Sequence, residues 1–115
     1  MLSKTECTLV AEFLQGLANP VRVKILCALR EGEKSVSEIV RETGEKQSNV
    51  SQQLQILLHK GYLSRRREER NVFYAIKKAE LFTLMEQIRS LVLAENQAGG
   101  EVEAGSQEAQ GLREG

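Results

Sequence analysis

The sequence predicts a mostly α-helical domain that carries one small β-hairpin. Apolar residues recur at helical spacing in five separate segments, and residues that start or end helices separate these segments. One further stretch, residues 62–77, has a polar turn followed by a strand-like segment in which Val72, Tyr74 and Ile76 share one face, which is typical of two paired strands. A chain of 115 residues can bury one core without disulfides or metals, so we expect a single domain.

The first two helices are predicted from an apolar stripe and from a helix start signal. Asn19 and Pro20 supply an N-cap and a proline at the first helical position, where its missing N–H costs no hydrogen bond. This second helix is expected to reach about Arg30 and to stop at residues 31–32. The first helix is expected to end near residues 16–18. Its apolar stripe consists of Leu9, Val10, Phe13, Leu14 and Leu17.

The next two helices form the middle of the predicted domain. Ser35 and Glu38 fit a capping box, in which each side chain hydrogen-bonds the backbone of the other residue. The box opens a short third helix that ends at Gly44, and the fourth helix closes at Gly61. The residues expected to face inward are Val36, Ile39 and Val40 on the third helix and Val50, Leu54, Leu57 and Leu58 on the fourth.

The hairpin and a fifth helix complete the fold prediction. Residues 68–71 are expected to form the hairpin turn, and Val72, Tyr74 and Ile76 share one face of the second strand. Residues 81–92 are apolar around much of the helical circumference, so this helix needs cover on more than one side. In a domain this small, a second copy of the chain could supply that cover.

Charge is unevenly distributed along the chain, although the formal net charge is zero. Residues 1–96 carry a net charge of +3, whereas residues 97–115 carry −3 and almost no large apolar side chain. Such a segment cannot bury enough apolar surface to offset its ordering entropy. We therefore expect one structured domain over residues 1–96 and a disordered acidic tail over residues 97–115.

Composition and motifs exclude several classes of protein. No run of about 18 apolar residues could span a membrane, and the N-terminus lacks the core of a signal peptide. We therefore expect a cytoplasmic protein whose two cysteines are thiols. One histidine, no aspartate and no glycine-rich phosphate loop leave no nucleophile–base pair, so an enzyme is not expected.

The fourth helix and the hairpin together indicate binding to double-stranded DNA. Two short helices joined across Gly44 and followed by a basic hairpin describe a winged helix-turn-helix, whose second helix presents side chains to base edges. A solvated helix face and a solvated hairpin would explain either feature alone, but both in this order favour nucleic acid. The candidate base-contacting residues are Gln47, Ser48, Asn49, Ser51, Gln52 and Gln53. The candidate phosphate-contacting residues are Arg65, Arg66, Arg67 and Arg70.

On these segments the chain resembles the ArsR/SmtB-type winged-helix repressors of bacteria. The resemblance covers about residues 8–95. It rests on "FLQGLANPVRVKILCAL", on "SVSEIVRETGEKQSNVSQQLQILLHKGYLSRRREERNVFYAI" and on the apolar helix after them. These stretches contain an Asn-Pro-x-Arg signature and a Ser-x-x-Ser-Gln-x-Leu signature. The resemblance implies a homodimer joined through the first and last helices, and operator binding that is lost when an inducer arrives. Gln53 departs from the family pattern, in which many members carry histidine.

The resemblance implies no metal inducer. Residues 35–37, which are Ser-Val-Ser, match the Cys-Val-Cys metal-binding element of the family, so both thiols are missing. The last-helix zinc site of the family needs aspartate and histidine, and residues 77–95 contain neither. We therefore expect no metal at either position and no cofactor.

A thiol remains as the candidate sensor. Cys27 matches the first of two redox cysteines in persulfide- and oxidant-sensing members, but residues 91–93, where the second would lie, are Leu-Val-Leu. Cys7 is the only substitute. Either cysteine could instead be a packed small apolar residue, and the two together could sense a thiophilic ion. The sequence thus predicts a DNA-binding repressor released by thiol modification at Cys27, and a winged helix that binds another protein is the alternative.

Overall fold

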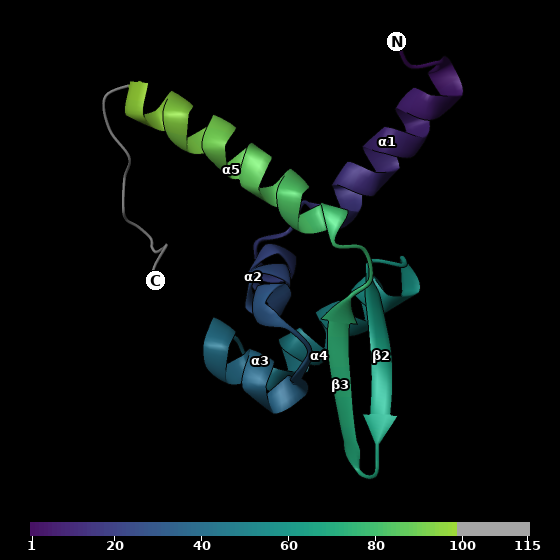
Figure 1. Cartoon of the computed structure of the whole chain (residues 1–115), viewed down its shortest axis with the longest axis vertical. Helices are drawn as coiled ribbons and strands as arrows, with labels where there is room; N and C mark the ends of the chain where they lie inside the picture. Colours follow the sequence, from purple (N-terminus) through teal and green to yellow (C-terminus); the bar gives the residue numbers. More distant parts are fainter. Residues whose placement is uncertain (99–115) are drawn as a thin grey trace. The chain divides into compact units, whose positions relative to one another are not determined.

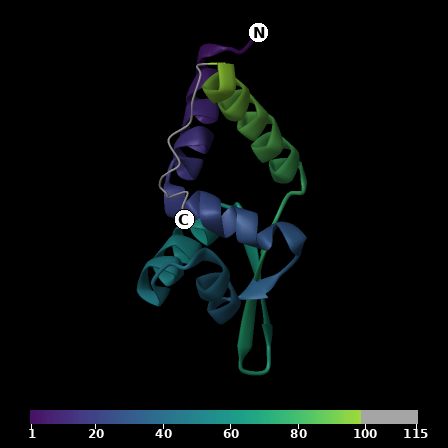
Figure 2. The same cartoon turned by 90° about the vertical axis from the view of Figure 1, so that its left-hand side faces the viewer.

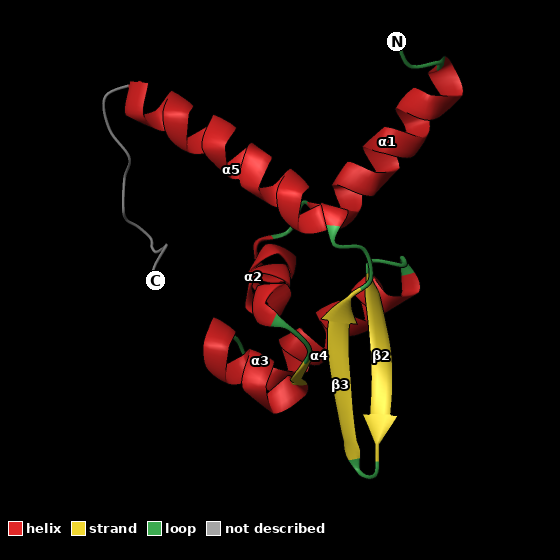
Figure 3. Ribbon diagram, viewed as in Figure 1, coloured by secondary structure: helices red, strands yellow, loops and turns green. Residues whose placement is uncertain are grey.

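A computed structural model describes residues 1–98 of the chain. The chain divides into two compact units, residues 1–79 and residues 80–115. The first unit contains helices and a small antiparallel sheet, and the described part of the second unit is a single helix (Figure 3). The elements are α1 (Lys4–Leu17), α2 (Pro20–Ala28), a 3-10 turn (Leu29–Glu31), β1 (Lys34–Ser35), α3 (Val36–Thr43), α4 (Gln47–His59), β2 (Leu63–Glu68), β3 (Asn71–Ile76) and α5 (Glu80–Ala98).

The predicted fold class is confirmed, because five α-helices and a hairpin occur in the expected order. Strands β2 and β3 pair in antiparallel register from Leu63 opposite Ile76 to Glu68 opposite Asn71, so the turn lies where the sequence placed it. Within the first unit, the hairpin tip extends beyond α3 and α4 in both perpendicular views (Figures 1 and 2). This extension is the wing of a winged helix-turn-helix.

The local start signals behave as predicted. The Asn19 side-chain oxygen accepts hydrogen bonds from the backbone N–H groups of Val21 and Arg22, at 2.9 and 3.1 Å, and Pro20 occupies the first turn of α2. Both bonds of the capping box between Ser35 and Glu38 are present. Each signal acts within four residues, so it needs no support from the rest of the fold.

Two details differ from the prediction. Helix α2 ends at Ala28, and the residues up to Glu31 form a 3-10 turn instead of a continuation of the α-helix. The sheet also has a third strand, β1, which pairs antiparallel with β3 and gives the strand order β1-β3-β2. A two-residue strand is too short to leave an alternating pattern in the sequence. Its pairing depends instead on the position of β3 in the fold.

The core of the first unit lies among α2, α3 and α4. Its fully buried side chains are Ile25, Leu26, Leu29, Ile39, Val50, Leu54 and Leu57. On α4 the buried residues Val50, Leu54 and Leu57 lie three and four positions apart, so this helix turns one apolar stripe inward. Val36, Val40 and Leu58, also predicted to face inward, are half-buried.

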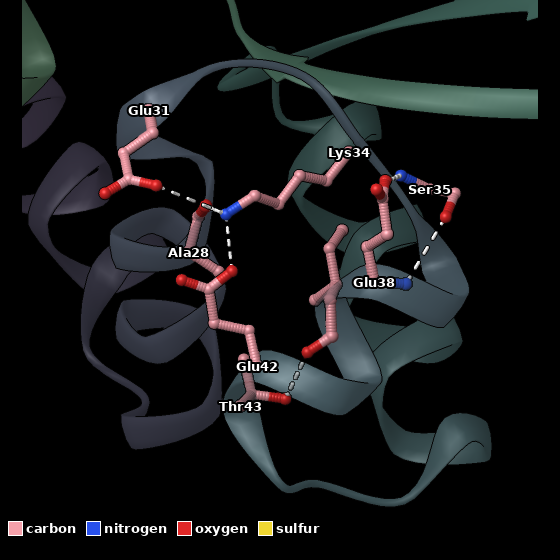
Figure 4. Close-up of polar contacts among 8 residues, drawn as sticks. Ala28, Glu31, Lys34, Ser35, Glu38, Glu42 and Thr43 are labelled. Carbon is pink, nitrogen blue, oxygen red and sulfur yellow. Dashed lines mark hydrogen bonds and ion pairs between the residues drawn. The ribbon is translucent and has the colours of Figure 1, made fainter.

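Lys34 joins the end of α2 to α3 (Figure 4). Its ammonium donates a hydrogen bond to the Ala28 carbonyl at 2.6 Å and forms an ion pair with Glu42 on α3. The Ala28 carbonyl belongs to the last turn of α2, where carbonyl groups lack partners within the helix. One mostly buried lysine thus satisfies the end of α2 and connects it to the last turn of α3.

Helices α1 and α5 expose apolar side chains. Every residue of α1 before Gly16 is exposed, including Leu9 at 59% and Leu14 at 46%. On α5, Leu91 is 71% exposed and Val92 is 50% exposed. Helix α5 continues past the predicted residue 92 to Ala98, and the predicted tail lies, from residue 99 onward, outside the described residues. None of the helices in the described part of the chain is long and apolar enough to cross a membrane.

Candidate nucleic-acid interface

Helix α4 divides into a buried face and a polar face. Val50, Leu54 and Leu57 are fully buried, and this stripe leaves the polar residues of the first two turns outside the core. The predicted base-contacting residues differ in exposure. Gln47, Ser48 and Gln52 are exposed, whereas Asn49, Ser51 and Gln53 are half-buried. The exposed members can meet a groove directly, and the half-buried members lie at the edges of the polar face.

Gln53 hydrogen-bonds within the protein. The Arg22 Nε–H donates to the Gln53 side-chain oxygen at 2.8 Å, and the Arg22 Nη1 group donates to the Gly16 carbonyl at 3.0 Å. The Gln53 amide nitrogen donates in turn to the Asn49 side-chain oxygen at 3.3 Å. The structure therefore links the Asn-Pro-x-Arg signature to α4, a connection that the sequence did not suggest.

The strand register separates the arginines of the wing. Arg65 lies opposite Tyr74, Arg67 lies opposite Val72, and Arg66 lies opposite Phe73. Side chains alternate across a strand, so Arg65 and Arg67 share the Tyr74 face and Arg66 belongs to the other face. The predicted basic cluster is thus divided between the two faces of the hairpin.

The Tyr74 face is the face that meets α4. The Gln55 side-chain amide on α4 donates a hydrogen bond to the Tyr74 hydroxyl at 3.3 Å. Gln55 is exposed and follows Gln52 by three positions, so both lie on the polar face of the helix. The polar face of α4 therefore borders the hairpin face that carries Arg65 and Arg67.

Arg66 is held by two carboxylates and an aromatic ring. Its guanidinium forms two hydrogen bonds with Glu33, at 2.5 and 3.1 Å, and one with Glu68 at 2.8 Å. The guanidinium carbon also lies 4.8 Å from the centre of the Phe73 ring. The hydrogen bonds from Arg66 lower the pKa of the Glu33 carboxyl, so this partner stays ionised at neutral pH. Within the described residues, Arg65, Arg67 and Arg70 form no ion pair.

Both cysteines are exposed. The interpretation of Cys7 and Cys27 as packed apolar residues is therefore wrong for the single chain. The ammonium of Lys24, three positions before Cys27, pairs with Glu45 at 2.8 Å. Among the described residues, no three side chains from histidine, cysteine, aspartate and glutamate form a group that could hold a metal ion.

Comparison with known proteins places the chain in a family. Residues 19–65, which include α2, α3 and α4, match the family described as "Bacterial regulatory protein, arsR family". The biofilm growth-associated repressor of Xylella fastidiosa is 35% identical over 86 residues, which cover 75% of this chain and 75% of that protein.

Two solved structures are similar over most of their length. The crystal structure of Rv0081 from Mycobacterium tuberculosis has 35% identity and a TM-score of 0.69, and the match covers 81% of this chain and 97% of that one. The homodimeric winged helix-turn-helix DNA-binding domain of Mb0332 from Mycobacterium bovis has 32% identity and a TM-score of 0.67, with 82% and 93% covered. The chain therefore belongs to the arsR family of bacterial regulatory proteins, which are DNA-binding transcriptional regulators and not enzymes.

Proposed function

We propose that the protein is a repressor that acts in the cytoplasm as a homodimer and binds an operator through α4 and the wing. The observation that carries this proposal is the continuity between the polar face of α4 and the Arg65–Arg67 face of the hairpin, which the bond from Gln55 to Tyr74 joins. A helix that enters the major groove needs such a flank, because phosphates border the groove on both sides.

The residues of this surface have separate roles in the proposal. Exposed amides and hydroxyls at the start of α4, with Gln52 the foremost, read base edges. Arg65 and Arg67 bind phosphates beside the groove, and Arg70 at the hairpin tip reaches a phosphate or the neighbouring minor groove. Gln47, Ser48 and Ser51 support base contacts, whereas Gln53 and Arg66 act on their neighbours in the protein.

The exposed apolar faces of α1 and α5 support the homodimer. Large apolar side chains exposed in rows are unusual on a monomer and mark an interface. A second copy of the chain presents the same faces, and a two-fold axis then pairs two identical reading helices. We accordingly propose an imperfect palindrome whose half-sites lie about one helical turn apart.

Replacing Gln52 with alanine tests base reading. The variant is expected to lose about 1–3 kcal/mol of discrimination between the preferred operator and unrelated duplexes, because a bidentate amide–base contact is removed. Fluorescence anisotropy on both duplexes measures the difference. His59→Ala, an exposed position at the far end of the same helix, is the matched control. A wild-type protein that binds all duplexes alike, or with no dependence on salt, would point to a protein-interaction module instead.

Among the wing arginines, those without an ion pair within the protein are expected to contribute most to phosphate binding. Arg67→Ala should weaken binding to all sequences alike and lower the slope of log affinity against log salt by about 1. Arg66→Ala should have a smaller effect, because two carboxylates already compensate its charge. Glu33→Gln should strengthen binding to all sequences, because it removes a negative charge near the wing. Equal losses for Arg66→Ala and Arg67→Ala would contradict this order.

Thiol chemistry at Cys27 is the proposed release signal. The exposure of Cys27 supports access by a persulfide donor or an oxidant. We expect polysulfide to release wild-type protein and the Cys7→Ser variant from DNA, and to leave the Cys27→Ser variant bound. If neither polysulfide nor peroxide releases the wild-type protein, this signal is excluded. If arsenite releases the wild-type protein but neither cysteine variant, the result favours the thiophilic-ion alternative.

A further inference from the structure

A chain of hydrogen bonds runs from the start of α2 to the polar face of α4. Arg22 donates from Nε to the Gln53 side-chain oxygen at 2.8 Å, and Gln53 donates from its amide nitrogen to the Asn49 side-chain oxygen at 3.3 Å. Gln53 and Asn49 lie one turn apart on α4, so their side chains are neighbours. All three residues are half-buried, which shields the bonds from competition with water.

Arg22 fixes the direction of every bond in this chain. A guanidinium carries only donors, so the group that it meets on Gln53 must be the oxygen. The amide nitrogen of Gln53 then faces the other way, toward Asn49, and can only donate. Asn49 must therefore turn its oxygen toward Gln53, which leaves its NH₂ group on the side away from Gln53.

Arg22 is itself anchored at both ends. Its backbone N–H is capped by the Asn19 side chain at 3.1 Å, and its Nη1 group donates to the Gly16 carbonyl at 3.0 Å. These contacts leave the guanidinium little freedom to turn away from α4. The orientation of the Asn49 amide thus depends on a residue outside the recognition helix.

We propose that Arg22, acting through Gln53, is a specificity-determining positioning residue that makes Asn49 present its NH₂ donor to the major groove. This inference rests on the proposed operator binding by α4. In the major groove, guanine N7 and O6 and thymine O4 are acceptors, whereas cytosine N4 is a donor. The chain of hydrogen bonds from Arg22 to Asn49 therefore favours guanine or thymine over cytosine at the base that Asn49 meets.

One substitution should reverse the hydrogen bond between residue 53 and Asn49 while keeping the bond from Arg22. In Gln53→Glu, one carboxylate oxygen still accepts from Arg22, and the other faces Asn49 and can only accept. Asn49 must then donate its NH₂ inward and turn its oxygen toward the groove. The favoured base at that position should change from guanine or thymine to cytosine, whose N4 group donates. Adenine has both an N7 acceptor and an N6 donor, so it does not distinguish the two orientations.

The experiment selects bound duplexes from a library randomised over about two helical turns. Asn49→Ala identifies the base position, because its preference disappears there alone. At that position Gln53→Glu should reverse the preference by about threefold to tenfold, the value of one hydrogen bond. Gln53→Met, which keeps the side-chain length, should weaken the preference without reversing it. In the Asn49→Ala background, Gln53→Glu should have no effect at that position.

Two results would overturn the inference while leaving operator binding intact. In the first, the Asn49→Ala variant keeps the wild-type preference at every position. In the second, the Gln53→Glu variant selects the same base as wild type. If Gln53→Glu does not fold, as judged by circular dichroism, Asn49→Asp gives the same reversal, because a carboxylate presents only acceptors to the groove. A wild-type protein that selects no sequence contradicts the proposed function itself.

Discussion

Replacing Gly16 with alanine is expected to destabilise the protein by about 1–3 kcal/mol. A Cβ atom at this position would lie 2.3 Å from the Tyr62 hydroxyl oxygen and 2.8 Å from a ring carbon. The ring cannot easily withdraw, because its hydroxyl donates to the Phe13 carbonyl at 2.5 Å and the two rings form a T-shaped pair with centres 5.0 Å apart. The close approach of Tyr62 is what attaches the end of α1 to the rest of the first unit.

Helix propensity predicts the opposite sign, which makes the measurement decisive. Alanine is about 1 kcal/mol better than glycine inside a helix, and Gly16 is helical. Urea unfolding at fixed protein concentration should show the loss in Gly16→Ala, and a much smaller loss when Tyr62→Leu is already present. Gly44→Ala is the contrasting control, because Gly44 has φ +74° and open space, so its cost comes from backbone strain alone. A stabilised Gly16→Ala variant would refute the packing argument.

The elements that the sequence predicted well are those set by neighbours along the chain. The cap at Asn19, the box at Ser35 and the turn at Gly44 each depend on a few adjacent residues, and all three are present. The second strand of the hairpin also follows from local alternation. Strand β1 and the 3-10 turn after α2 could not be found in this way, because Lys34 takes its place from contacts with β3, Ala28 and Glu42.

The candidate site shows the same division. The sequence identified the polar start of α4 and the arginines of the wing, but it treated Gln52 and Gln53 as equivalent. In the structure, Gln53 differs from Gln52 because it is half-buried and accepts a hydrogen bond from Arg22, 31 residues away. Strand alternation alone could have separated Arg66 from its neighbours, whereas its pairing with Glu33, 33 residues away, requires the fold.

Replacing Leu91 with lysine is expected to convert the proposed homodimer to a monomer and to lower operator affinity by about 10²- to 10⁴-fold. Leu91 is the most exposed large apolar residue of α5, so in the proposed dimer it gains the most cover from the partner. A lysine there would have to bury an ammonium without a counter-charge, which costs several kcal/mol. A monomer meets one half-site at a time and loses the gain from binding two together.

Ser90→Lys is the matched control, because it adds the same charge one residue away. Ser90 lies one turn from Glu86 and Gln87, on the polar side of α5, so its variant is expected to stay dimeric and to bind the operator as wild type does. Light scattering at micromolar concentration gives the mass of each variant, and anisotropy gives its affinity. Leu9→Lys should repeat the result from α1, since Leu9 is 59% exposed. If Leu91→Lys remains a dimer, or if Ser90→Lys dissociates as readily as Leu91→Lys, the apolar face of α5 is not the dimer interface.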